Sequence, residues 1–106
     1  MTTRRRRFEV LLPLEFNDGR SVPPEVLGEA VHEVKVQFGG ATYQAYPIEG
    51  YWIHKGVHYQ DTHAKLVVDV PNTAKNRAWM KQFKKRWKVR LEQIDIWMVS
   101  YLIEVE

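Results

Sequence analysis

The sequence predicts an α+β domain whose elements follow in the order β-α-β-β-α-β. Two observations carry this prediction. Four segments show the apolar alternation or the continuous apolar runs of strands, and two segments repeat apolar residues at helical spacing. A chain of 106 residues with 44% hydrophobic and 27% charged residues has the length and composition of one globular domain.

The first strand is expected over residues 8–16, where every second residue is apolar and two glutamates point the other way. Pro13 lacks the N–H that a ladder hydrogen bond needs, so we expect an unpaired stretch or a bulge there. The chain is then expected to turn at Asn17-Asp18-Gly19.

Two helices are predicted from caps and from apolar periodicity. The first begins at Pro23-Pro24, which suit a first helical turn, and ends at Gly39-Gly40. The second follows Pro71, with Asn72 or Thr73 as its N-cap, and runs to about residue 91. Their apolar stripes consist of Leu27, Ala30, Val31, Val34 and Phe38 in the first helix, and of Trp79, Met80, Phe83, Trp87 and Leu91 in the second.

The remaining strands are a hairpin with arms at 42–53 and 57–70 and a last strand at 94–105. This element order resembles the ferredoxin-like superfold, in which a four-stranded antiparallel sheet carries two helices on one face. The resemblance covers residues 8–106 as a single domain, and residues 1–7 are expected to form a flexible basic N-terminal arm. The superfold serves RNA-binding, ligand-sensing and enzymatic proteins, so it selects no function.

Several classes of function are excluded by what the sequence lacks. Without cysteine there are no disulfides, thiolate metal sites or iron–sulfur clusters, which fits a reducing compartment. No apolar run approaches the roughly 20 residues of a membrane span, and no secretory signal is recognisable. Phosphate-loop, nucleophile-elbow and zinc-protease motifs are also missing. We expect a soluble cytoplasmic protein with no metal, cofactor or membrane partner, and a non-enzymatic role is favoured.

The sheet face that the helices leave uncovered is the expected place for a ligand or a partner. Side chains that alternate onto this face have nothing in the chain to cover them, and an exposed apolar patch of that kind marks a binding surface. These residues are Leu11, Pro13, Tyr59, Val67, Trp97, Val99, Tyr101 and Ile103. We expect this face to bind a small molecule or to pair with a second copy in a homodimer. The alternative is that the residues pack within their own subunit.

The hairpin contains a second candidate site. Alternation places Asp61 and His63 on one face beside Tyr59, whereas His58 points to the opposite face. A metal site that uses both histidines is therefore not expected. Asp61 could orient the imidazole of His63 for acid–base work. A solvated or structural role for the same residues is the more common outcome.

Charge is distributed unevenly along the chain. Residues 73–106 carry 8 Lys+Arg against 4 Asp+Glu, whereas residues 1–72 carry 8 against 9. The candidate polyanion-binding residues are Arg4, Arg5, Arg6, Arg7, Arg77, Lys81, Lys84, Lys85 and Lys88. A nucleic acid would neutralise them with a strong dependence on salt. The favoured alternative is that the helical cations are solvated or pair with Glu25, Glu29 and Glu33 of the first helix.

One comparison bears directly on nucleic-acid binding. RNA-recognition domains share this element order and carry [KR]-G-[FY]-[GA]-F-V-x-[FY] on the third strand. The corresponding segment is KGVHYQDT, in which Lys55 and Gly56 match and Tyr59 approximates the fifth position. The other positions differ, which argues against a standard RNA-recognition domain. A purely structural or interaction role is the third alternative.

Overall fold

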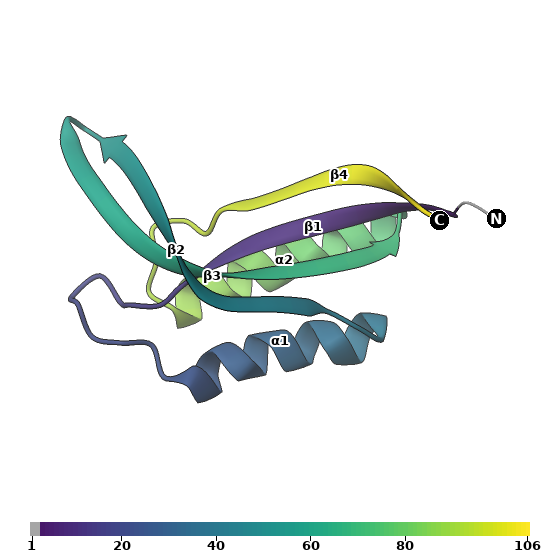
Figure 1. The fold of residues 1–106 in the computed structure, drawn as a ribbon, viewed down its shortest axis with the longest axis horizontal. Coiled ribbons are helices and arrows are strands. Elements are labelled where there is room, and N and C mark those ends of the chain that lie inside the picture. The colour runs from purple at the N-terminus through teal and green to yellow at the C-terminus, as the bar shows by residue number, and fades with distance from the viewer. Residues whose placement is uncertain (1–2) are drawn as a thin grey trace.

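The computed structural model describes residues 3–106 and confirms the predicted element order (Figure 1). The strands are β1 (Thr3–Pro13), β2 (Thr42–His54), β3 (Val57–Pro71) and β4 (Met98–Val105), and the helices are α1 (Pro24–Phe38) and α2 (Ala74–Arg90). The strands form one antiparallel sheet in the order β2-β3-β1-β4. Both helices lie on the same side of this sheet, as the ferredoxin-like arrangement requires.

The core fills the space between the sheet and the two helices. Phe8, Val10 and Leu12 of β1 are buried there, together with every second residue of β3 from Ala64 to Val70. The buried helical residues are Leu27, Ala30 and Val34 in α1 and Met80, Phe83 and Trp87 in α2. All six belong to the predicted stripes. Each large side chain buried in this way contributes roughly 1.5–3 kcal/mol, so this layer is the main source of stability.

The helix ends follow the predicted chemistry. Gly39 ends α1 in the left-handed region with φ 86°, where a side chain would be strained. The hydroxyl of Thr73 caps α2 by accepting a hydrogen bond from the backbone N–H of Asn76 at 3.1 Å. No helix among residues 3–106 is both long and apolar enough to cross a membrane.

Pro13 stands where the ladder between β1 and β4 has ended. The last contact on that side is the backbone hydrogen bond from Leu11 N–H to Trp97 O, at 2.9 Å. The backbone nitrogen of Pro13, two residues further on, faces the same side, where no strand lies that could accept a hydrogen bond. On its other side β1 continues to pair with β3 as far as Pro13 opposite His63. The expected unpaired stretch is therefore present.

Arg4–Arg7 lie in β1, whereas the sequence predicted a flexible arm over residues 1–7. Arg5–Arg7 pair with Pro71–Asp69 of β3, and the four arginines pair with residues 104–101 of β4. Residues 1 and 2 of the predicted arm lie outside the described residues. The side chains of Arg4–Arg7 give no apolar signal for a strand. They lie in a strand because β3 and β4 are long enough to pair with their backbone.

Beyond the sheet, β2 and β3 continue as a two-stranded hairpin that rises away from the body of the molecule (Figure 1). The register shifts between Gln44 and Ile48. The hairpin closes at Lys55 and Gly56, whose φ values of 50° and 76° suit a two-residue primed turn. Near the tip the large apolar side chains of Tyr51, Ile53 and Val57 are exposed.

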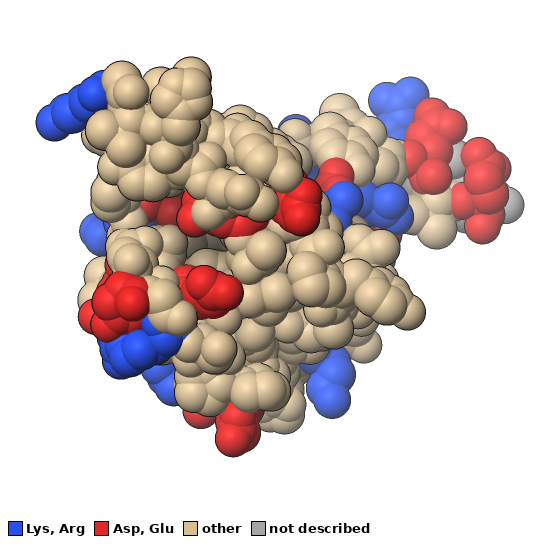
Figure 2. Space-filling model, turned by 60° about the vertical axis from the view of Figure 1, so that its left-hand side comes forward, with Lys and Arg blue, Asp and Glu red and all other residues tan. Residues whose placement is uncertain are grey.

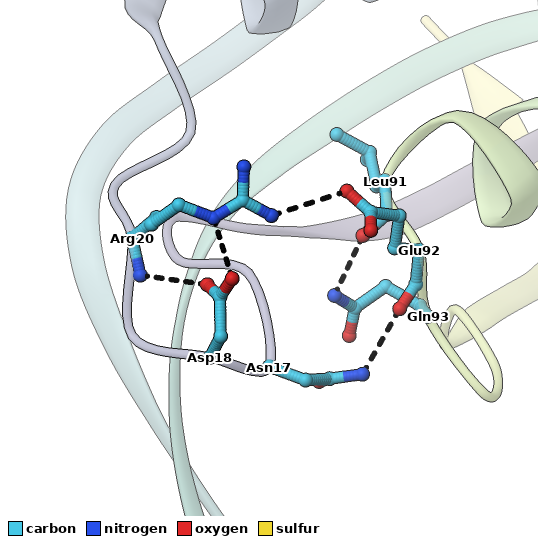
Figure 3. A network of polar contacts seen from close by, with 6 residues as sticks. All are labelled: Asn17, Asp18, Arg20, Leu91, Glu92 and Gln93. Carbon is cyan, nitrogen blue, oxygen red and sulfur yellow. Dashed lines mark hydrogen bonds and ion pairs between the residues drawn. The ribbon is translucent and has the colours of Figure 1, made fainter.

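The last strand starts later than predicted. The sequence indicated a strand from residue 94, but the paired strand β4 begins at Met98. Before it, Glu92 takes a positive φ of 55° and turns the chain after α2. Figure 3 shows this turn tied to the loop after β1, where Asn17 Nδ2 donates to the Glu92 carbonyl at 2.9 Å and Arg20 reaches the Glu92 carboxylate at 3.4 Å.

Candidate ligand site on the open sheet face

The open face of the sheet carries charged residues at its centre. Register places Glu9 of β1 between Val67 of β3 and Val99 of β4, and places Arg7 between Asp69 and Tyr101. The sequence predicted an apolar and aromatic surface here. The structure supplies that surface only around a central row of charges.

The predicted face residues take different positions. The side chains of Leu11, Val67, Val99 and Ile103 are half-buried on the open face, and Pro13 is buried. Tyr101 and Tyr59 are exposed. Trp97 precedes β4 instead of lying in it, and its side chain is also exposed.

Glu9 is the centre of a three-residue polar network. Its carboxylate accepts a hydrogen bond from the Tyr101 hydroxyl at 2.5 Å and forms an ion pair with the Lys65 ammonium. The hydrogen bonds from Lys65 and then Tyr101 hold the pKa of Glu9 below its ordinary value. Donation to Glu9 raises the pKa of the Tyr101 phenol. At neutral pH the site therefore presents a fixed anion beside a protonated phenol.

Arg7 and Asp69 form a second, bidentate pair on the same face. Arg7 Nε and Nη2 donate to the two carboxylate oxygens of Asp69 at 2.8 and 2.9 Å. The hydrogen bond from Arg7 lowers the pKa of Asp69, and the same contact raises the pKa of Arg7. This fork fixes both side chains in one orientation, next to the Glu9 network.

The hairpin contributes an aromatic pair. The rings of Trp52 and Tyr59 stack with centroids 4.4 Å apart and planes 17° apart. Trp52 Nε1 donates to Asp61 Oδ2 at 2.5 Å. An open hollow of about 460 Å³ lies at this level, bordered by Tyr51, Trp52, Ile53, His58, Tyr59 and Gln60. The lining of this hollow contains no Asp or Glu, whereas Figure 2 shows acidic side chains below the projecting hairpin.

Asp61 and His63 do not form the hydrogen-bonded pair that the sequence suggested. Asp61 is held by Trp52, and within residues 3–106 the buried Nδ1 of His63 has no hydrogen-bond partner. The imidazole packs against Gly50, where an added Cβ would lie 3.1 Å from its Cε1 atom. Throughout the described chain no three His, Asp or Glu side chains are grouped closely enough to hold a metal ion.

The candidate polyanion-binding residues have different partners, although Arg6 and Arg77 meet at Asn72 Oδ1. Lys84 pairs with Asp95 at 3.1 Å, and Arg77 donates to Asn72 at 2.7 Å. Lys81 and Lys85 are exposed, and Lys88 is half-buried. In the N-terminal run, Arg4 lies 4.0 Å from Glu104, Arg6 bonds Asn72 and Ser100, and Arg7 is committed to Asp69.

Ion pairs connect α2 to α1, but their cations are not the ones that the sequence predicted. Arg86 bonds Glu33 at 2.6 Å, and Arg90 bonds Glu29 at 2.8 Å. Neither arginine was in the predicted basic set, whose face was chosen from helical spacing alone. Glu29 and Glu33 are therefore engaged by the side of α2 that packs toward them, whereas Glu25 has no such bond within residues 3–106. Trp87 Nε1 adds a third bond, to Glu33 at 2.7 Å.

Comparison with known proteins gives a result at the level of the fold. No protein-family model and no curated protein sequence matches the chain. Among solved structures, it is similar to a phage SAM lyase in complex with S-methyl-5'-thioadenosine, with a TM-score of 0.70 and 7% identity over 95% of this chain and 88% of that one. A phage SAM lyase in the apo state gives a TM-score of 0.60 and 11% identity over 99% and 91%.

Proposed function

We propose that this chain binds S-adenosylmethionine (SAM) on the open sheet face and cleaves it to S-methyl-5'-thioadenosine. The observation that carries the proposal is the near-complete superposition on a SAM lyase that holds this thioether, which covers 95% of the chain at a TM-score of 0.70. Because a fold hosts many functions, the proposal also depends on what the residues of the open face offer.

The central network suits a ligand that carries a positive charge. SAM contains a sulfonium ion, and the carboxylate of Glu9 is an anion whose side chain is only 17% exposed. In such a partly dehydrated place a charge attracts an opposite charge more strongly than it does in water. The Tyr101 hydroxyl holds the carboxylate in place, and Lys65 is the cation with which the sulfonium would share it.

The aromatic pair of the hairpin suits the nucleoside part of SAM. The stacked rings of Trp52 and Tyr59 present an exposed aromatic surface beside the sheet. Aromatic side chains bind bases by stacking, at about 1–3 kcal/mol per base. An adenine ring is a planar ligand of this kind, so we assign the nucleoside end of the ligand to the hairpin side of the face.

The reaction places modest demands on acid–base groups. Release of S-methyl-5'-thioadenosine breaks one C–S bond, and the electron pair moves to sulfur and neutralises the sulfonium. If the substrate's own carboxylate attacks the carbon that sulfur leaves, a lactone forms and no proton is transferred. A site that holds charges in position is then sufficient, which agrees with the separation of Asp61 from His63.

We also propose that the chain acts as a homodimer. The open hollow beside the hairpin leaves a ligand largely in water, whereas small-molecule sites bury about 70–90% of their ligand. The exposed side chains of Tyr51, Ile53 and Val57 add an apolar surface near the hairpin tip. Light scattering of the purified chain tests this: a dimer that Tyr51→Ser weakens is expected, and a monomer at every concentration contradicts it.

The activity test uses purified chain, SAM and product detection by chromatography and proton NMR. We expect S-methyl-5'-thioadenosine to accumulate, and Glu9→Gln to lower kcat/KM by about tenfold or more, which corresponds to about 1.4 kcal/mol of lost stabilisation. Glu15→Gln is the matched control, because that exposed side chain makes no hydrogen bond or ion pair within residues 3–106. A chain that folds yet neither binds nor cleaves SAM refutes the proposal.

A further inference from the structure

A second hollow lies at the other end of the open face, away from the hairpin. Because β2 begins at Thr42 opposite Val67, residues 68–71 of β3 extend past it without a partner on that side. A hollow of about 320 Å³ forms in this gap, and its lining includes Arg5, Arg7, Thr42, Asp69 and the turn 39–41.

Cations outnumber anions in this hollow. Arg5 and Arg7 bring two guanidinium groups, and Asp69 is the one carboxylate in the lining. Arg7 engages both oxygens of Asp69. Arg5 is half-buried and makes no hydrogen bond or ion pair within residues 3–106. Arg5 is near enough to Asp69 to help lower the pKa of that carboxyl. Two guanidinium groups nevertheless share one carboxylate, so the hollow carries one net positive charge.

The turn 39–41 adds backbone donors. The N–H of Gly39 donates to the carbonyl of Lys35 at 2.7 Å, which ends α1. In the described chain the N–H groups of Gly40 and Ala41 have no backbone partner. The space beside Gly40 is open, since a Cβ built there would meet nothing within 4 Å. Donors without acceptors therefore gather at this edge of the hollow.

We propose that this hollow binds a small oxyanion, a carboxylate or a phosphate, between the Arg5 guanidinium and the turn 39–41. A guanidinium presents parallel N–H donors that match two oxygens of either group. The oxyanion balances the remaining positive charge of the hollow, because both oxygens of Asp69 already bind Arg7.

The oxyanion has two potential sources, and the test separates them. If it is the carboxylate of SAM, the inference rests on the proposed function, and the site holds the amino-acid end of that substrate. If it is a separate phosphate, the site works independently of SAM. S-methyl-5'-thioadenosine carries neither group and serves as the neutral probe.

The experiment measures affinities by calorimetry for inorganic phosphate, SAM and S-methyl-5'-thioadenosine, with the unmodified chain, Arg5→Gln and Arg4→Gln. Arg4→Gln is the matched control, because it removes the same charge from the adjacent residue, which is 81% exposed and lies 4.0 Å from Glu104. Arg5→Lys keeps the charge but loses the fork. Unchanged thermal unfolding shows that each variant is folded.

Phosphate and SAM are the two probes that carry an oxyanion. We expect Arg5→Gln to weaken the binding of one of them by about tenfold, while Arg4→Gln leaves it within about twofold. A loss confined to SAM, with the thioether unaffected, identifies the substrate carboxylate. A loss for phosphate identifies a separate anion, and this result stands even if SAM does not bind. The proposal is overturned if neither anion binds, or if Arg5→Gln and Arg4→Gln behave alike toward both anions.

Discussion

Replacement of Glu9 by glutamine removes one charge from the centre of the open face and keeps the size of the side chain. In the native chain Lys65 and Tyr101 both direct donors at this carboxylate. Glutamine offers one weaker acceptor in place of two charged oxygens, and Lys65, whose side chain is 31% exposed, loses its counter-ion. The folded state should therefore lose stability even though no apolar contact changes.

The size of the loss follows from burial. An exposed ion pair contributes about 0.2–1 kcal/mol, and a hydrogen bond to a charged group contributes about 1.5–3 kcal/mol. Glu9 and Lys65 lie between these limits, with 17% and 31% of their side chains exposed. After allowance for solvent screening we expect a loss of about 1 kcal/mol at pH 7. In a domain of this length that lowers Tm by about 4–8 °C.

The dependence on pH identifies the cause. The folded-state pKa of Glu9 lies below its ordinary value of 4.5, so its contribution is present above that value and disappears as pH falls through the lowered pKa. The Tm difference between the native chain and Glu9→Gln should therefore be full at pH 7 and shrink toward zero at an acid pH below the lowered pKa of Glu9. Circular dichroism melts at constant ionic strength measure it, with Glu15→Gln as control. A difference of equal size at both pH values would refute the electrostatic explanation.

Three further predictions concern other parts of the molecule. Gly50→Ala should lower Tm, because its Cβ would stand 3.1 Å from His63 Cε1; an unchanged melt would show that the imidazole moves aside freely. Gly28→Ala should raise stability by about 0.5–1 kcal/mol, because this helical glycine has open space around it, and a lower Tm would contradict that. Binding of DNA and RNA at about 50 mM salt, measured by fluorescence anisotropy, should be weaker than about 10⁻⁴ M. Salt-sensitive micromolar binding that Lys81→Gln with Lys85→Gln abolishes would instead establish the nucleic-acid alternative.

The fold was accessible from the sequence because its signals are local. Alternation at Phe8, Val10 and Leu12 defines the inner face of β1, and helical spacing defines the stripes that meet it. Four consecutive arginines carry neither signal. Their strand depends on β3 and β4, which reach far enough to pair with them and bring Asp69 to Arg7. Only knowledge of strand length and register would have extended β1 to Thr3.

The contacts of the candidate site are likewise of two kinds, those that local sequence signals predict and those that depend on distant strands. The contact between Trp52 and Asp61 was within reach, because a turn at Lys55-Gly56 sets the pairing of Trp52 with Tyr59 and puts Asp61 on the same face. The network of Glu9 needs the register of three strands that are far apart in the chain. Sequence alternation places Glu9 on the open face but cannot select its neighbours from among those on β3 and β4.

The open side of β1 has an acidic residue at one end and basic residues at the other, and this order gives the face a direction. Glu9 lies toward the hairpin, the Arg7–Asp69 pair follows, and Arg5 borders the oxyanion hollow. At about 3.4 Å per residue, the Cα atoms of Glu9 and Arg5 are about 14 Å apart. An extended ligand with a cation and an anion apart from each other matches this order in one orientation only. If the ligand is SAM bound in this way, its carboxylate must leave Arg5 before it can attack the carbon beside sulfur. The thioether product of SAM lacks both the sulfonium and the carboxylate, so its affinity differs from that of SAM at both ends. The effect of Arg5→Gln on the affinity for SAM therefore measures how far the Arg5 end takes part.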